Sequence, residues 1–113
     1  MGTLAKISLV SGDNRPYIRL TLKDTNTGNP IDVSSPSTVV QVHFRQSGST
    51  EVLAILACTK PNGGADGVVQ FNFPGTTLDV EPGSYEGEVE IDFAGETQTV
   101  YDVLKFNIRA EFA

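Results

Sequence analysis

The residues best suited to chemistry in this chain of 113 residues are four carboxylates that alternate along one short segment. Glu86, Glu88, Glu90 and Asp92 are separated by single Gly, Val and Ile residues, so all four project from one side of an extended strand. Alternate residues of a strand lie ~6.5–7 Å apart, which is too far for two carboxyl groups to share a proton. A glycosidase pair also needs an insulated acid in a cleft. The pattern therefore favours a solvated face, with docking to a neighbouring subunit as the alternative.

Asp24, Asn26, Gly28 and Asp32 form a second group, whose spacing is loosely similar to that of a calcium loop. Gly28 stands at the fifth position, where an EF-hand loop supplies an oxygen ligand, and no glutamate closes the loop. A β-turn between two strands accounts for the same residue types. We therefore predict no metal site and no cofactor.

One histidine and one cysteine are present, which leaves few ways to build a catalytic centre or a zinc site. His43 alternates with Val42 and Phe44, so its ring is predicted to face outward, and no Gly-x-Ser-x-Gly segment accompanies it. Cys58 lies inside an apolar run, which is typical of a small buried hydrophobe in a reducing compartment. These residues indicate no enzymatic activity.

Net charge and the length of the apolar runs argue against two classes of partner. Eight Lys and Arg against fourteen Asp and Glu give a formal charge of −6, and the basic residues occur singly along the chain. Such a surface repels a nucleic-acid backbone. No apolar run approaches the ~18 residues of a membrane span. We therefore predict neither a nucleic acid nor a membrane as partner.

Strands are the elements that must position these residues, because apolar side chains recur at every second position. In residues 85–93 every even position is acidic, while the odd positions carry Tyr, Gly, Val, Ile and Phe. Segment 38–46 likewise places Val40, Val42 and Phe44 on one face. The same alternation predicts strands over residues 4–10, 17–24, 38–46, 67–73, 85–93 and 103–109.

Seven consecutive apolar residues at 52–58 interrupt this alternation. A buried strand and a short helix both fit a run of this length. Gly48 and Ser49 form a turn before the run and Pro61 follows it, which favours the strand and leaves the helix as the alternative.

The acidic strand has informative residues at both of its ends. At its far end, Gly95 and Glu96 fit a two-residue type II′ hairpin turn, with glycine at the first central position. This turn would place Glu86 opposite Lys105, which is a favourable cross-strand pair. At its start, Tyr85 occupies the place where sandwiches often have a corner tyrosine.

About seven short strands without a convincing helix are typical of two packed sheets. The chain has no tryptophan and no cysteine pair, which excludes an antibody-type domain but no other immunoglobulin-like sandwich. We predict an all-β fold, an immunoglobulin-like antiparallel β-sandwich that forms one domain over residues 1–113.

Several short segments, taken in their order along the chain, form a longer pattern: Gly12, Asp13 and Pro16, then residues 20–24, 28–33, 40–45, 67–71, 82–85 and 88–93. This ordered set resembles the immunoglobulin-like N-terminal domain of the baseplate upper proteins of tailed bacteriophages. Phe73 stands where that family usually has tryptophan. The resemblance implies a component of a virion.

From this resemblance we expect a non-enzymatic structural protein at the tail, baseplate or fibre attachment point of a tailed phage. It would be made in the host cytoplasm and would assemble through sheet edges and termini with other virion proteins and with copies of itself. A capsid decoration protein is the nearest alternative, and a carbohydrate-binding or adhesion module is an alternative of another class. The candidate interface residues are Glu86, Glu88, Glu90, Asp92, Tyr17 and Phe112.

Overall fold

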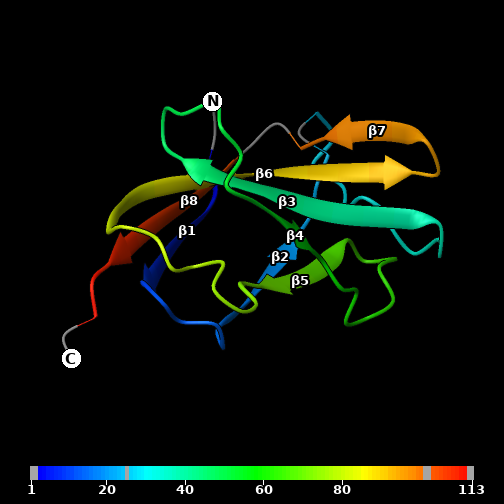
Figure 1. Ribbon diagram of the computed structural model, residues 1–113. Coiled ribbons are helices and arrows are strands. Elements are labelled where there is room, and N and C mark those ends of the chain that lie inside the picture. The colour runs from blue at the N-terminus through cyan, green and yellow to red at the C-terminus, as the bar shows by residue number, and fades with distance from the viewer. Residues whose placement is uncertain (1–2, 25, 101–102, 112–113) are drawn as a thin grey trace.

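The computed structural model describes residues 3–24, 26–100 and 103–111, and its regular structure is β-strand throughout (Figure 1). In chain order the strands are β1 (Thr3–Val10), β2 (Tyr17–Thr21), β3 (Thr38–Gln46), β4 (Ala54–Ala57), β5 (Val68–Asn72), β6 (Gly83–Phe93), β7 (Glu96–Thr99) and β8 (Val103–Arg109). No helix occurs in the described part of the chain, and so none that could cross a membrane.

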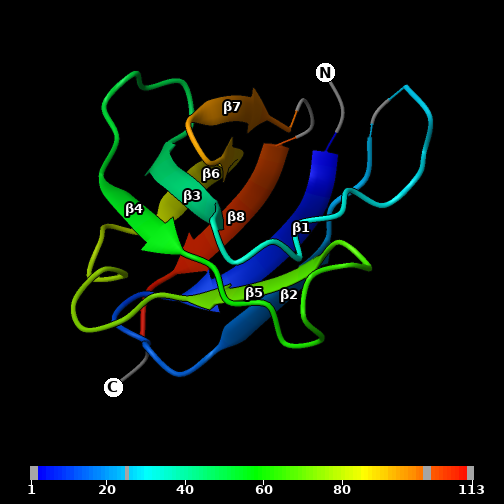
Figure 2. The same cartoon turned by 90° about the vertical axis from the view of Figure 1, so that its right-hand side faces the viewer.

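The strands form two sheets that face each other. The larger sheet has the order β1-β8-β6-β3-β4, with β7 paired to the far end of β6, and the smaller sheet consists of β2 and β5. Figure 2 shows the larger sheet from β4 at one border to β1 at the other, with β2 and β5 as a separate layer. All pairs of strands are antiparallel except β1 and β8. The prediction of an all-β immunoglobulin-like sandwich is confirmed, with eight strands instead of about seven.

Alternation of apolar and polar residues places one face of each strand in the core. Val40, Val42 and Phe44 of β3 are buried as predicted, and the segments 38–46 and 103–109 coincide with β3 and β8. The remaining predicted strands match β1, β2, β5 and β6 to within a few residues. The period of two therefore identified these six strands and the face that each one buries.

Phe44 lies at the centre of an aromatic cluster in the core. Its ring centroid is 5.1 Å from that of Phe73, 5.3 Å from that of Tyr85 and 5.5 Å from that of Phe106. The Tyr85 hydroxyl donates a 2.7 Å hydrogen bond to the carbonyl of Glu81, four residues earlier. This bond ties the start of β6 to the preceding turn, so the predicted corner tyrosine is confirmed.

The apolar run at 52–58 is strand β4, as favoured over the helix, but it is not a buried strand. Leu56 is buried in the core and Ala54 and Cys58 are partly buried against it, whereas Val52, Leu53 and Ile55 are exposed. The physical reason is position: β4 lies at the border of the larger sheet, and the second layer covers only its inner face. Seven apolar residues in a row therefore put half of their side chains into solvent.

The predicted hairpin turn at Gly95 and Glu96 is wrong by one residue. Phe93 pairs with Glu96, so the two turn residues are Ala94 and Gly95, with φ angles of 56° and 103°. Positive φ at both central residues is the type I′ geometry, which matches the twist of the flanking strands. The Asp92 carboxylate accepts a 2.7 Å hydrogen bond from the Gly95 amide, which stabilises this turn. Strand β7, which the turn starts, was not predicted.

The predicted pairing of Glu86 with Lys105 is confirmed, but not through that hairpin. Strand β7 pairs with the far end of β6, where Glu90 lies opposite Thr99. Strand β8 then pairs with the near end of β6, in a register that differs from that of β7 by two residues. The sequence thus predicted the correct partner of Glu86, although the hairpin turn from which it was inferred lies one residue earlier and joins β6 to β7.

Candidate functional site

The four acidic residues of β6 lie on the outer face of the larger sheet, because they alternate with its core residues. Glu88 and Asp92 are exposed and Glu90 is half-buried, so the prediction of a solvated face holds for this part of the strand. Glu86 differs, since it is buried despite its charge. A buried carboxylate requires partners, which the neighbouring strands supply.

Glu86 sits within a row of basic side chains that runs across four strands. Register places Arg45 of β3 and Lys105 of β8 on either side of Glu86, and Lys6 of β1 next to Lys105. Arg45 donates to Oε1 of Glu86 from Nε at 2.9 Å and from Nη2 at 2.8 Å, and Lys105 Nζ lies 3.3 Å from Oε2. We call Arg45, Glu86, Lys105 and Lys6 the charged row. Basic residues that occur singly in the sequence are therefore gathered by sheet register.

The charged row controls the ionisation of its carboxylate. Burial acts to raise the pKa of Glu86. The hydrogen bonds from Lys105 and Arg45, together with their positive charges, outweigh burial and hold the pKa of Glu86 below its usual value. Glu86 is therefore an anchored counter-ion, which keeps two cationic side chains in a fixed position on the surface.

The outer face carries opposite charge at its two ends. The charged row has three cations and one carboxylate, while Glu88, Glu90 and Asp92 follow it along β6. Glu86 and Asp92 are six residues apart, or ~20 Å along the strand. A rigid sheet that separates charge in this way can orient a partner by electrostatic complementarity.

His43 lies between these two ends, facing outward as predicted. It pairs across the strands with Glu88, and its Nε2 is 3.8 Å from Oε2 of Glu90. That nitrogen is buried and has no hydrogen-bond partner among the residues that the structure describes. A distance of 3.8 Å is too long for a hydrogen bond, so the imidazole and the carboxylate do not form a working acid-base pair here.

A shallow pocket of about 310 Å³ adjoins the charged row on the same face. Small polar side chains line it beside the two lysines of the row, namely Ser8, Ser47, Ser84 and Asn107. Strand register aligns Ser84 with Asn107, and Asn107 with Ser8. Hydroxyl and amide groups in this arrangement suit contact with polar groups of a partner.

The aromatic candidates lie apart from the acidic residues. Tyr17 is 66% exposed at the start of β2, in the smaller sheet, so the structure does not bring it together with Glu88 or Asp92. Phe112 lies outside the described residues. The predicted interface residues thus do not form one continuous surface.

The polar loop after β2 uses its oxygen atoms for its own folding. The Asp24 carboxylate accepts hydrogen bonds from the amides of Asn26 and Thr27, at 2.9 Å and 3.2 Å. Hydrogen bonds from the side chain and backbone of Ser34 lower the pKa of Asp32. Across the described ranges, no three His, Cys, Asp or Glu side chains are grouped so as to hold a metal ion. The carboxylates of Asp24 and Asp32 therefore stabilise turns, in agreement with the interpretation of this segment as a β-turn.

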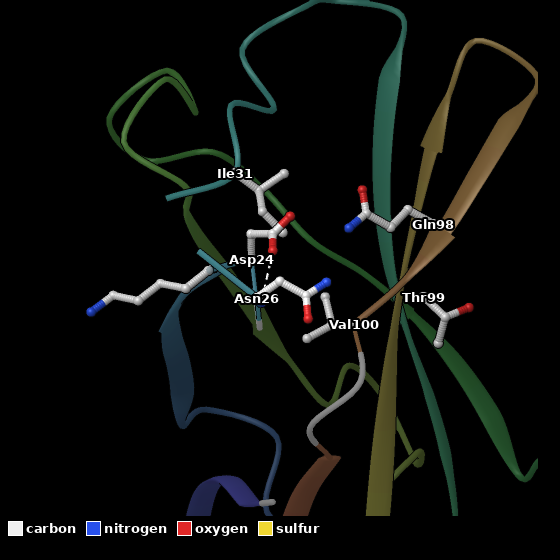
Figure 3. A pocket seen from close by; sticks show the side chains of 7 residues that line it. Asp24, Asn26, Ile31, Gln98, Thr99 and Val100 are labelled. Atoms are coloured by element: carbon white, nitrogen blue, oxygen red, sulfur yellow. Dashed lines mark hydrogen bonds between the residues drawn. The ribbon is translucent and has the colours of Figure 1, made fainter. Parts of the chain in front are cut away.

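A second pocket, of about 340 Å³, opens between this loop and β7 (Figure 3). Its lining residues are Lys23, Asp24, Asn26, Ile31, Gln98, Thr99 and Val100. Figure 3 shows the amides of Asn26 and Gln98 entering the space from opposite sides, with Ile31 and Val100 as apolar walls. In the sequence, Asn26 was considered only as part of the loop that loosely resembles a calcium site, and Gln98, which is far away along the chain, was not singled out.

Cys58 is half-buried at the end of β4, against the core. Burial raises the pKa of its thiol to about 12. The thiol is therefore protonated at neutral pH and a weak nucleophile, in agreement with its interpretation as a small hydrophobe.

A comparison with protein-family models finds no match to this chain, and a comparison with curated proteins finds no relative.

Proposed function

We propose that this chain is a non-enzymatic structural module of a tailed-phage virion, located at the tail, baseplate or fibre attachment point. The ordered resemblance to the immunoglobulin-like domain of baseplate upper proteins supports the virion as its place. The outer face of the larger sheet supports the assembly role. That face, with the charged row at one end and Glu88, Glu90 and Asp92 at the other, is the observation that carries the proposal.

The size of this face suits a stable contact. Strand β6 has 11 residues, and five strands lie side by side across the sheet. At ~3.3 Å per residue and ~4.8 Å per strand, the face measures at most about 36 by 24 Å, since the other four strands are shorter than β6. A standard interface buries ~800 Å² on each partner, so a contact of that size would use nearly the whole face. Paired strands also need little rearrangement when they bind.

The positions of the three groups with shifted pKa values favour a contact surface over a catalytic site. Asp32, Cys58 and Glu86 lie on separate parts of the fold, and each has a local cause for its shift in pKa. General acid-base catalysis needs two groups whose environments push their pKa values apart beside the same substrate. These three groups close a turn, fill the core and anchor two cations.

Composition of the purified particle tests the virion assignment. Virions of the phage that encodes this chain should be purified, separated into heads and tails, and analysed by mass spectrometry. We expect the chain in the tail fraction. Its presence in heads alone would replace the tail role by capsid decoration, and its absence from both fractions would overturn the proposal.

The pocket between the loop and β7 supports a second candidate function, the binding of a carbohydrate. Asp24, Asn26 and Gln98 offer a carboxylate and two amides around apolar walls, which suit the hydroxyl groups and the carbon skeleton of a sugar. Titration of the labelled chain with a panel of monosaccharides should then shift the NMR signals of Asn26, Gln98 and Val100. Gln98→Ala should abolish the shifts at Asn26 and Val100, while Gln46→Ala, at an exposed glutamine elsewhere, should not. Unchanged spectra with every sugar would reject this function.

A further inference from the structure

Exposed apolar side chains gather at the border of the larger sheet. Among the described residues, five large hydrophobic side chains are exposed, and three of them lie within four residues of each other at β4. Val52 is 44% exposed, Leu53 46% and Ile55 57%. Single exposed apolar residues are ordinary, but a cluster of this kind marks a contact surface.

Among the described residues, Ile55 and Ala57 of β4 have no backbone partner on the outer side of the strand, whereas Thr59, the next residue that faces outward, exchanges hydrogen bonds of 2.7 Å and 2.9 Å with Gln70 of β5. The Cys58 amide donates a 2.9 Å hydrogen bond to the carbonyl of Val40, its partner across the strands. Because hydrogen-bonded pairs alternate in an antiparallel ladder, Leu56 and Ala54 also face β3. The N–H and C=O groups of Ile55 and Ala57 then point away from the larger sheet, of which β4 is the border strand (Figure 2).

Two of the features that prevent strand addition are absent from this border: residues 52–59 include no charged residue and no proline, although β4 itself has only four residues. Lys60 follows, but its ammonium donates to the carbonyls of Ser35 and Thr38, at 2.9 Å and 2.6 Å, and is thereby held in place. The border strand at the opposite side of the sheet, β1, carries the exposed Lys6. Natural sheets often protect free edges with charges or prolines, so the uncharged backbone at Ile55 and Ala57 is suited to a partner strand.

We propose that β4 pairs with β4 of a second copy of this chain, antiparallel and about a two-fold axis at Leu56. In this register Ile55 lies opposite Ala57 of the second copy, and Ala57 lies opposite its Ile55. The outward N–H and C=O groups of these residues form four hydrogen bonds, and the larger sheet continues through both copies. Each large Ile55 side chain packs beside a small Ala57.

Charge favours this edge over the outer face for a second copy. Each chain carries a formal charge of −6, so two copies repel each other at long range. The uncharged segment 52–59 brings no like charges together. The outer face would place Glu88 and Glu90 of one copy near those of the other if the two faces were stacked. The inference rests on the proposed assembly role and specifies its edge and its partner.

Sedimentation of the purified chain over a range of concentrations tests the pairing. We expect association of the unmodified chain, weakened more than about tenfold by Ile55→Lys, because the lysine adds charge where apolar contact is needed. Val39→Lys is the matched control: Val39 is 47% exposed on β3 of the same sheet, away from the edge, so association should not change. Ile55→Thr keeps a β-branched residue and tests the apolar contact if the lysine variant unfolds.

Amide hydrogen exchange identifies the strand that pairs. The amides of Ile55 and Ala57 should become protected as concentration rises, while the Leu56 amide is protected at every concentration. A chain that stays monomeric would overturn the proposal. Association that Val39→Lys abolishes, or that leaves Ile55 and Ala57 unprotected, would also overturn it and would indicate stacking of faces. Each of these results leaves the virion assignment to be decided by particle composition alone.

Discussion

The two faces of the larger sheet are made from the same strands and have opposite chemistry, as its three central strands, β8, β6 and β3, show. Neighbouring residues supply both of them: Phe44 and Arg45, Tyr85 and Glu86, and Phe106 and Lys105. On the inner face, ring centroids lie 5.1–5.5 Å from that of Phe44. On the outer face, ion-pair distances of 2.8 Å and 3.3 Å join Glu86 to its two cations. The inner residues are needed for folding, whereas the charged outer residues are available for contact with a partner.

The inner face supplies most of the stability. Full burial of an aromatic side chain removes ~150–250 Å² from water and contributes several kcal/mol. The ion pairs of the outer face join cations that remain partly exposed, and such pairs contribute ~0–1 kcal/mol each. Folding therefore explains the inner residues, whereas the charged row is better explained by contact with a partner.

Removal of the central ring should have the largest effect. Phe44→Ala leaves a cavity among Phe73, Tyr85 and Phe106, and should lower the free energy of unfolding by ~3–5 kcal/mol. Chemical denaturation measures the change, and Phe44→Leu, which fills more of the space, should cost less. A loss below ~1 kcal/mol for the alanine variant would show that the core does not depend on this ring.

An added methyl group on the inner face should have the next largest effect. A Cβ atom at Gly87 would lie 2.9 Å from Cγ1 of Val42 and 3.0 Å from Cε2 of Phe106. Gly87→Ala should therefore cost ~1–3 kcal/mol through overpacking. Ser84→Ala, at an exposed position of the same strand, is the control and should change stability little. Equal stability of the two variants would contradict close packing at Gly87.

Neutralisation of the buried carboxylate should have a smaller effect that depends on pH. Glu86→Gln removes the acceptor of two charged hydrogen bonds, and should cost about 1 kcal/mol at pH 7 because both cations are partly solvated. The folded-state pKa of Glu86 is lowered, so the stability that its carboxylate contributes is present above the unfolded pKa of ~4.3 and is lost as pH falls through the folded pKa.

Unfolding curves of both proteins between pH 7 and pH 3 measure this dependence. The difference in free energy of unfolding should shrink as the solution becomes acidic. A constant difference at all pH values would mean that Glu86 acts through packing and not through its charge.

Residues close together along the chain made most of the fold predictable. Alternation identified the strands and the inner residues Val40, Val42 and Phe44, because the side-chain period of a strand is a local property. The bond from Tyr85 to Glu81 spans four residues, so the corner tyrosine was also within reach. The turn at Ala94 was missed because alanine rarely adopts a positive φ.

The candidate surfaces depend on pairing between distant strands and could not be predicted. Pairing of β3 with β6 brings Arg45 to Glu86, and pairing of β1 with β8 brings Lys6 to Lys105; the sequence specifies neither pairing. The apolar run was expected inside, because hydrophobicity alone cannot tell a border strand from a central one. Only the sheet order shows that Ile55 faces solvent.

The smallest effect is expected at the end of the charged row. Lys6 is exposed and next to Lys105, so Lys6→Gln should change the free energy of unfolding by no more than ~0.5 kcal/mol. Incorporation of the variant into virions, measured against the unmodified chain in one mixed infection, should nevertheless fall if the row binds a partner. A destabilisation above ~1 kcal/mol would assign Lys6 to the fold. Unchanged stability with reduced incorporation would instead separate the two faces by function, since a charge that folding does not need would be required for assembly.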